Sequence, residues 1–246
     1  MRVFALNLSD SVGGAAKAAY RIHKAVTLAG VDSTLIVNRK SSVEASVIGL
    51  KSIFQVWIDR FRSGFGVLMA RTIRTPNTDY HSAAIFPTRW SKKLDRSDVD
   101  VIHLHWINGE MMSINDLGAI QKPLVWTLHD MWAFSGAEHY PKTSRWRDGY
   151  TQANRPVVEK GFDLNRWTWN RKRNAWKRPI QIVTPSHWLA ECVKNSVLMR
   201  GWPVEVIPNP IDVDQWMPLD KKLAREKLGL PLGVPLIFIW SDWRCR

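Results

Sequence analysis

The sequence contains little cysteine, and its two cysteines, Cys192 and Cys245, show no disulfide or zinc-binding spacing. This scarcity argues against a disulfide-stapled secreted domain and favours a reducing, cytoplasmic setting. No apolar run approaches the ~18 residues that a membrane-spanning helix needs. The first residues, Met1–Asn7, carry one basic residue and an apolar stretch too short for a signal peptide. We interpret them as a buried strand.

Acidic residues are also few relative to basic ones. Asp and Glu number 22 against 35 Lys and Arg, so the formal net charge is +13. An excess of this size predicts attraction to an anionic partner, which is nucleic acid, an acidic membrane face or a phosphorylated small molecule. The 246 residues are 45% hydrophobic, which suits one large globular domain or two small ones. The 14 tryptophans fit core positions, sugar-stacking platforms or interfacial anchors.

Short β-branched segments alternate with helical patterns along most of the chain. This alternation predicts an α/β fold with a Rossmann-like, doubly wound and mostly parallel sheet. The predicted strands are residues 2–8, 32–38, 99–106, 123–130, 180–184, 204–207 and 236–240. The predicted helices are residues 15–29, 113–121, 165–177 and 220–228, with a further helix capped by Ser186.

The loop between the first strand and the first helix contains Gly13 and Gly14. Ligands of open α/β sheets bind at the carboxyl ends of the strands, and a helix N-terminus there offers free N–H groups to a phosphate. The loop has neither the GxGxxG spacing of a dinucleotide site nor the Lys-Ser/Thr ending of a P-loop. A Gly-Gly pair is equally compatible with a tight turn.

Two histidine motifs end predicted strands. His103 and His105 lie on the same face of one strand, which makes a metal-dependent hydrolase one hypothesis. A metal site needs more ligands, and only His129 and Asp130 follow at suggestive spacing. His129 and Asp130 end the strand 123–130, where a histidine can hydrogen-bond a sugar or act as an acid or base. The alternative is a strand-end cap made by Asp130.

Two basic segments also contain aromatic residues. Residues 51–74 have apolar residues at near-helical spacing with arginines around them, so the helix either packs on the sheet or lies on an anionic membrane. Residues 165–178 interleave Trp with Lys and Arg, which is the best nucleic-acid-like stretch of the chain. Because Trp169 and Trp176 share a helix face, a helix docked by that face with its charges in solvent is the simpler interpretation. A basic α/β module that docks to membrane or nucleic acid without catalysis is therefore the alternative function.

Taken in order, these landmarks resemble family 4 glycosyltransferases of the GT-B fold, and most of all bacterial, cyanobacterial-type members that build cell-surface polysaccharides. The similarity runs from residue 1 to about 240. The matching stretches are Gly13–Arg21, Val31–Thr34, Val101–Gly109, Trp126–Trp132, Gly136–Tyr140, Thr184–Ala190 and Val206–Asp212.

The resemblance implies that the first domain binds the acceptor and a second domain binds a nucleotide-sugar, which is a co-substrate rather than a cofactor. The sugar is transferred with retention of configuration and without a catalytic metal. His129 matches the catalytic histidine that touches the donor sugar, and Gly13 and Gly14 would face its phosphates. The substrate-binding residues expected from the matching stretches are Gly13, Gly14, His105, Trp106, Asn108, Asp130, Ser186 and Asn209.

The resemblance also predicts the domain organisation. Residues 1–210 would form the acceptor-side domain, and residues 211–246 the hinge and the start of the donor-binding domain. The family's Glu-x7-Glu motif does not occur after the hinge, so a truncated chain without independent transferase activity is expected. The expected acceptor is a saccharide or lipid-linked saccharide. Peripheral contact with the inner face of an anionic membrane is expected, and nucleic acid is not expected as a partner.

Overall fold

The computed structural model describes residues 1–50 and 52–237, and the chain divides into two units, Met1–Pro210 and Ile211–Arg246. The larger unit is built on a seven-stranded sheet with the order β3-β2-β1-β5-β6-β8-β9, in which every adjacent pair is parallel. Its strands are β1 (Arg2–Ser9), β2 (Asp32–Arg39), β3 (Val47–Ile48), β5 (Val101–Leu104), β6 (Leu124–Thr127), β8 (Gln181–Thr184) and β9 (Val204–Val206). The prediction of a Rossmann-like, doubly wound parallel sheet is confirmed.

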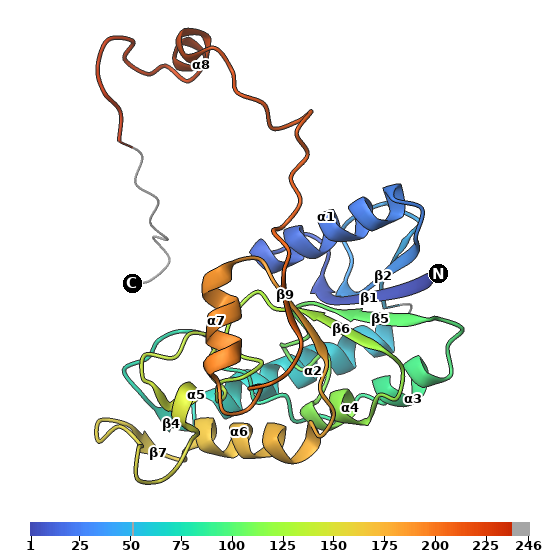
Figure 1. The fold of residues 1–246 in the computed structure, drawn as a ribbon, viewed down its shortest axis with the longest axis vertical. Helices are drawn as coiled ribbons and strands as arrows, with labels where there is room; N and C mark the ends of the chain where they lie inside the picture. Colours follow the sequence, from blue (N-terminus) through green and yellow to red (C-terminus); the bar gives the residue numbers. More distant parts are fainter. Residues whose placement is uncertain (51, 238–246) are drawn as a thin grey trace. The chain divides into compact units, whose positions relative to one another are not determined.

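Helices cover both faces of the sheet (Figure 1). The helix α1 (Gly14–Leu28) lies on one face. On the other side lie α2 (Ile53–Ala70), α3 (Trp90–Asp95), α4 (Ile114–Ala119) and α6 (Leu164–Ala175). The remaining elements of this unit are α5 (Arg145–Asp148), α7 (His187–Asn195) and a two-stranded antiparallel ribbon of β4 (Ile73–Arg74) and β7 (Lys160–Gly161). None of the helices in the described ranges combines the length and hydrophobicity needed to cross a bilayer.

The register of the strands separates the core into two layers. One row of paired residues crosses four neighbouring strands and belongs to the large core cluster; it consists of Leu6, Leu104, Trp126 and Ile182. Ala5 and its neighbours point the other way, toward α1, where the core is small. The buried face of α1 suits this narrow space because it consists of three alanines and one histidine, His23.

The long periodic segments were predicted well, and short elements were missed. The predicted helix 15–29 is α1, and the predicted strand 32–38 is β2. Ser186 caps α7, accepting a hydrogen bond from the backbone N–H of Leu189 at 3.3 Å. The missed elements are β3, β4, β7, α3 and α5, none longer than six residues.

The unit that begins at Ile211 contains α8 (Lys221–Lys227). Asp220 caps it through the backbone N–H of Leu223 at 2.8 Å, and Gly229 follows with a φ of +64°. This agrees with the helix predicted over 220–228. Residues 238–240 of the predicted strand 236–240 lie outside the described residues.

The basic and aromatic stretch 165–178 is docked rather than exposed as a nucleic-acid platform. Trp169 and Trp176 are buried in the large core cluster, as the shared face predicts. The expectation that its charges are solvated is wrong for Lys172, which is fully buried. Its Nζ donates to the carbonyl oxygens of Trp132, Ser135 and Gly136, and lies 3.8 Å from the centre of the Trp132 ring.

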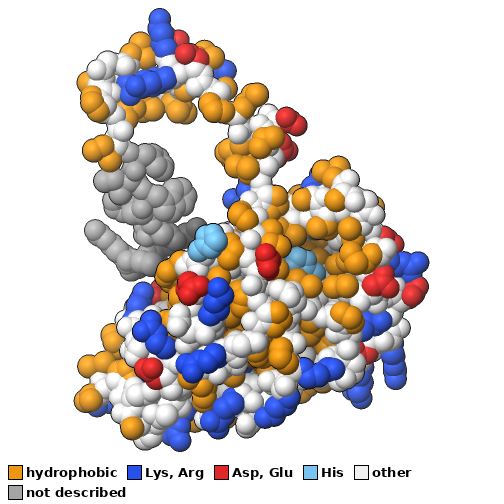
Figure 2. All heavy atoms as spheres, in the orientation of Figure 1, with side chains coloured by type: hydrophobic (Ala, Val, Ile, Leu, Met, Phe, Trp, Pro, Cys, Tyr) orange, Lys and Arg blue, Asp and Glu red, His pale blue; other side chains and the backbone are white. Residues whose placement is uncertain are grey.

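Within the segment 51–74, residues 53–70 form α2 and residues 73–74 form β4. The helix packs on the domain, where Met69 contacts a buried cluster, and its arginines Arg60 and Arg71 are exposed. Most of its apolar stripe, however, does not face the core. Asp59 is the buried residue of this helix, while its Trp and Phe side chains are exposed to differing degrees. Figure 2 shows, on the face in view, lysine and arginine side chains spread over the part of the larger unit that contains α4 and α6.

Replacing Lys172 tests how strongly this ammonium group holds the loop after β6. Burial lowers the pKa of Lys172 well below its usual value, and three backbone carbonyls depend on the group as a donor. We expect Lys172→Met to lower the free energy of unfolding by about 2 to 4 kcal/mol, because buried acceptors would lose their partner. Urea denaturation measures this. Lys177→Met, at an exposed position of the same stretch, should change the free energy little, and equal effects of the two would contradict the interpretation.

Candidate functional site

A pocket of about 780 Å³ lies at the carboxyl edge of the sheet, where ligands of open α/β folds bind. It is formed by the ends of β1, β2 and β6, the start of α1, one side of α2 and the loops that follow. The predicted site residues that line it are Gly13, Gly14, Trp106, His129, Asp130 and Asn209.

The start of α1 offers backbone N–H groups to this pocket. Gly13 precedes the helix with a φ of +90°, and in the described residues no side chain caps this end or places an acid in the first turn. The Ser9 hydroxyl holds the loop by accepting from the backbone N–H groups of Ser11 and Val12, each at 3.2 Å. A Cβ added to either Gly13 or Gly14 would meet no protein atom within 4 Å. The helix end is therefore open to an anion.

His129 lines the same pocket as a neutral base. Burial lowers its pKa to about 4, although the nearby Asp130 charge works in the opposite direction. Its Nε2 lies 3.3 Å from Nδ1 of His105. A neutral imidazole both donates and accepts hydrogen bonds at pH 7, which suits a sugar hydroxyl.

Two further histidines lie next to His129: His103 on β5 and His105 just after it. Nε2 of His103 is 2.8 Å from Oγ1 of Thr127, and the His103 and His105 rings are 4.2 Å apart. Burial, followed by the neighbouring His129, lowers the pKa of His103 to about 4. Burial also lowers the pKa of His105 well below its usual value. Within residues 1–50 and 52–237, no three His, Cys, Asp or Glu side chains are grouped as metal ligands.

Asp130 organises the aromatic wall of the pocket. Its Oδ2 accepts from Trp106 Nε1 at 2.8 Å and lies 2.6 Å from His139 Nδ1, while Oδ1 accepts from the Trp132 backbone at 2.9 Å. Burial works to raise the pKa of Asp130, but the His139 charge and these hydrogen bonds outweigh it and lower the pKa. The carboxylate thus fixes the indole of Trp106 on the pocket wall.

Three predicted substrate-binding residues are not among those that line the pocket. His105 is buried behind His129, Asn108 is buried beyond the end of β5, and Ser186 lies on the surface as the cap of α7. His105 contacts His129, which lines the pocket. A direct substrate contact for these three residues stays a prediction.

Sequence reasoning missed several residues that line the pocket. Arg39 lies at the carboxyl end of β2, and the edge rule that singled out His129 applies to it equally. Tyr80, His139 and Tyr140 come from loops, and Ser63 comes from α2. His139 and Tyr140 belong to a stretch matched by resemblance, but periodicity carried no signal for Tyr80 or Ser63.

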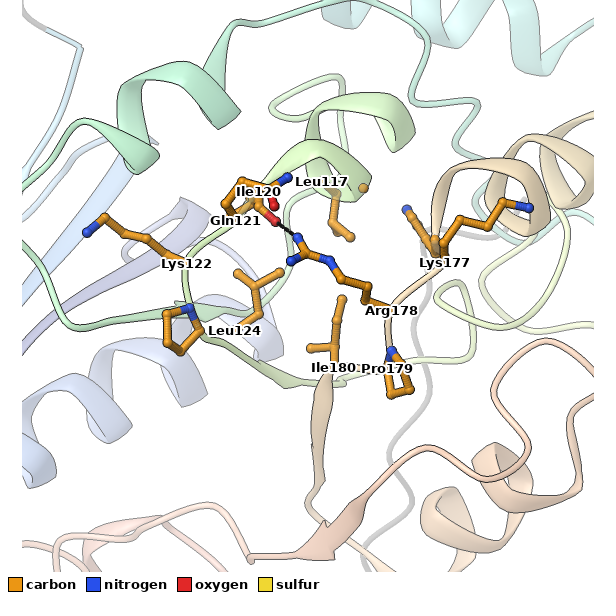
Figure 3. A pocket seen from close by; sticks show the side chains of 12 residues that line it. Leu117, Ile120, Gln121, Lys122, Leu124, Lys177, Arg178, Pro179 and Ile180 are labelled. Carbon is orange, nitrogen blue, oxygen red and sulfur yellow. Dashed lines mark hydrogen bonds between the residues drawn. The ribbon is translucent and has the colours of Figure 1, made fainter.

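A second cavity, of about 250 Å³, lies at the opposite edge of the sheet (Figure 3). It is bounded by the turns that enter β6 and β8, and Arg178 crosses it to donate to the carbonyl of Ile120 at 2.5 Å. That arginine already has its acceptor, and the amino ends of the strands are not where ligands of such sheets bind. The carboxyl-edge pocket is the candidate site.

The larger unit is thus a Rossmann-like domain whose carboxyl-edge pocket has a glycine loop on one side and aromatic residues on another. Residues 12–215 match the model of Glycosyltransferase Family 4, and the chain belongs to that family. No curated protein matches the chain in sequence.

Solved structures with similarity to the chain include Anabaena Alr3699/HepE in complex with UDP and glucose. It has 14% identity over 93% of this chain and 50% of that chain, with a TM-score of 0.44. A glycosyltransferase from Rickettsia africae ESF-5 has 12% identity over 95% of this chain and 51% of that chain, with a TM-score of 0.45. The chain thus spans about half the length of these proteins.

The buried histidines predict a pH dependence of stability. Unfolded histidines titrate near pH 6.5, whereas His103 and His129 titrate at about 4 in the folded chain. The contribution of these two histidines to the free energy of unfolding is therefore fully present above pH 6.5. It is lost as the pH drops toward 4, by up to about 1.4 kcal/mol per pH unit for each histidine.

Urea denaturation across this pH range measures the slope. We expect His103→Gln to flatten it by one histidine's share, because a neutral side chain then stays neutral in both states. His187→Gln, at an exposed site on α7, is the control and should leave the slope almost unchanged. A His103→Gln chain that loses stability as steeply as the unaltered chain would contradict the assignment.

Proposed function

We propose that Met1–Pro210 is the acceptor-side domain of a retaining, nucleotide-sugar-dependent glycosyltransferase in the synthesis of cell-surface polysaccharide or glycolipid. Membership of the family supports glycosyl transfer. The observation that carries the proposal is the uncapped start of α1, open at Gly13 and Gly14 to the pocket that the neutral His129 also lines.

The donor in this proposal is a nucleoside diphosphate sugar, such as the UDP-glucose bound by Alr3699/HepE. When the bond between the sugar and the diphosphate breaks, negative charge grows on the leaving phosphate oxygen. The N–H groups at the start of α1 and the positive end of its dipole would stabilise that charge. Arg39 lines the same pocket and would add positive charge there, while its Nε also lies 3.9 Å from Oδ2 of Asp59. The proposed reaction needs no resident cofactor or metal.

The acceptor is a saccharide or a lipid-linked saccharide. The apolar C–H face of a sugar packs well on an aromatic ring, and Trp106 is held in place by Asp130. Tyr80 and Tyr140 add hydroxyl groups to the same wall. His129 would bind a hydroxyl of the donor sugar, and His105 would fix the orientation of its ring. We propose that the reaction takes place in the cytoplasm, at the inner face of the membrane.

Replacing Gly14 with Ala tests the phosphate-facing role of the loop. The added methyl group meets open space, so the fold should be unaffected, but it would occupy the approach of a diphosphate to the helix end. We expect the affinity of the chain for UDP and UDP-glucose, measured by calorimetry, to fall about tenfold, or about 1.4 kcal/mol. The melting temperature should stay within a degree or two, since a helical Gly→Ala change costs nothing without a clash.

Gly64→Ala is the matched control. Gly64 also opens to empty space on a helix, but it does not line the pocket. It should leave the affinity for UDP unchanged. Equal affinities of the Gly14→Ala and unaltered chains for UDP would argue against the loop as a donor contact.

A further inference from the structure

The helix α2 is attached to the body of the domain by its polar side. Asn38 donates to Oδ1 of Asp59 at 2.5 Å, and the Ser63 hydroxyl donates to the carbonyl of Gly109 at 2.9 Å. Asp59 and Ser63 are four residues apart and therefore share one face of the helix. Gly66 continues this face, because a Cβ there would come within 2.9 Å of the Glu110 side chain. Polar and small residues make much of the inner face, and Met69 adds an apolar contact with a buried cluster.

Most of the large apolar side chains of α2 are exposed. Ile53, Trp57, Phe61 and Phe65 follow one another at intervals of four, and Leu68 extends the same stripe. Trp57 is 66% exposed, Phe61 69% and Leu68 58%. The stripe runs along roughly 22 Å of helix. A surface helix ordinarily turns its apolar stripe toward the core, whereas the stripe of α2 faces away from it.

The charges around the stripe are of one sign. Arg60 and Arg71 flank it on the helix surface and are exposed, and Arg74 follows just beyond. The only carboxylate between residues 53 and 74 is Asp59, which is buried on the inner face. The outer surface therefore consists of aromatic and aliphatic side chains with arginines beside them. Phe86, packed edge-on at 5.1 Å from Phe65, widens the apolar area.

This combination suits an anionic lipid surface better than it suits another protein. Arginines pair with lipid phosphates, and Trp and Phe side chains insert at the boundary between headgroups and acyl chains. A second copy of this chain would bring the same arginines against one another. The net charge of +13 adds a general attraction to an anionic membrane.

We propose that the outward face of α2, formed by Ile53, Phe54, Trp57, Phe61 and Leu68 with Arg60 and Arg71, docks the protein on the anionic phospholipid surface of a membrane. The helix lies in the plane of the interface. Ser63 and Val67 of the same helix line the carboxyl-edge pocket, so docking would hold that pocket near lipid-borne molecules. This last step rests on the proposed function, whereas the docking itself does not.

Vesicle flotation tests the docking without a donor or an acceptor. The purified chain is mixed with vesicles of phosphatidylcholine alone or of phosphatidylcholine with phosphatidylglycerol. We expect it to float with the anionic vesicles and to stay behind with the neutral ones. The double variant Trp57→Ser, Phe61→Ser should reduce the partition coefficient at least tenfold, because two inserted rings are lost. Circular dichroism would show that the variant is folded, since both side chains are exposed.

Two matched controls separate this face from general properties of the chain. Trp188→Ser removes an exposed tryptophan from α7 and should leave flotation unchanged. Arg60→Gln with Arg71→Gln should weaken flotation severalfold, whereas Lys177→Gln with Arg200→Gln, which removes the same charge elsewhere, should weaken it far less.

Several outcomes would overturn the proposal. These are failure of the unaltered chain to float with anionic vesicles, equal flotation with neutral vesicles, or equal loss in the Trp57→Ser, Phe61→Ser variant and the Trp188→Ser control. Sedimentation that shows a dimer abolished by the Trp57→Ser, Phe61→Ser change would assign the face to self-association instead. Because no nucleotide-sugar is present, none of these outcomes bears on glycosyl transfer.

Discussion

The Asp130 carboxylate is the interaction on which the rest of the site depends. It lies at the end of β6 and receives three hydrogen bonds, from the indole of Trp106, the backbone of Trp132 and the ring of His139. These partners come from the end of β5 and from the long loop after β6. A carboxylate buried at this depth is stable only with such donors. The network joins two strand ends to a loop that has little regular structure of its own, and Lys172 holds the same loop from beneath.

The electrostatics of the pocket follow from this arrangement. The Asp130 carboxylate accepts hydrogen bonds from Trp106, Trp132 and His139. The neighbouring His129 stays neutral, because burial outweighs the attraction of the carboxylate and lowers the pKa of His129 to about 4. The groups of the pocket that can attract an anion are the uncapped start of α1 and Arg39, which also faces Asp59. An edge with a neutral imidazole, the indole ring of Trp106 and free N–H groups suits a ligand with a sugar at one end and a phosphate at the other.

The sequence predicted the sheet and the glycine loop because both depend on local order. Strand, loop and helix follow one another from Arg2 to Leu28, and a loop at that point lies at the carboxyl edge in any parallel sheet. His129 was found by the same rule. Tyr80 and Ser63 could not be found this way, because they reach the pocket from a loop and from a helix whose positions depend on tertiary packing. Arg39 could have been found, since it ends β2.

The orientation of α2 shows where periodicity stops being informative. A repeat of apolar residues every three or four positions identifies a stripe, but it does not say whether the stripe faces the core. For α2 the choice is made by Asp59 and Ser63, whose partners Asn38 and Gly109 belong to other elements. Turning the stripe inward would leave the Asp59 carboxylate without Asn38 and would press aromatic rings against the space that Gly66 leaves for Glu110. The polar contacts therefore decide the direction, and the exposed stripe is a consequence of how the helix is held rather than of loose packing.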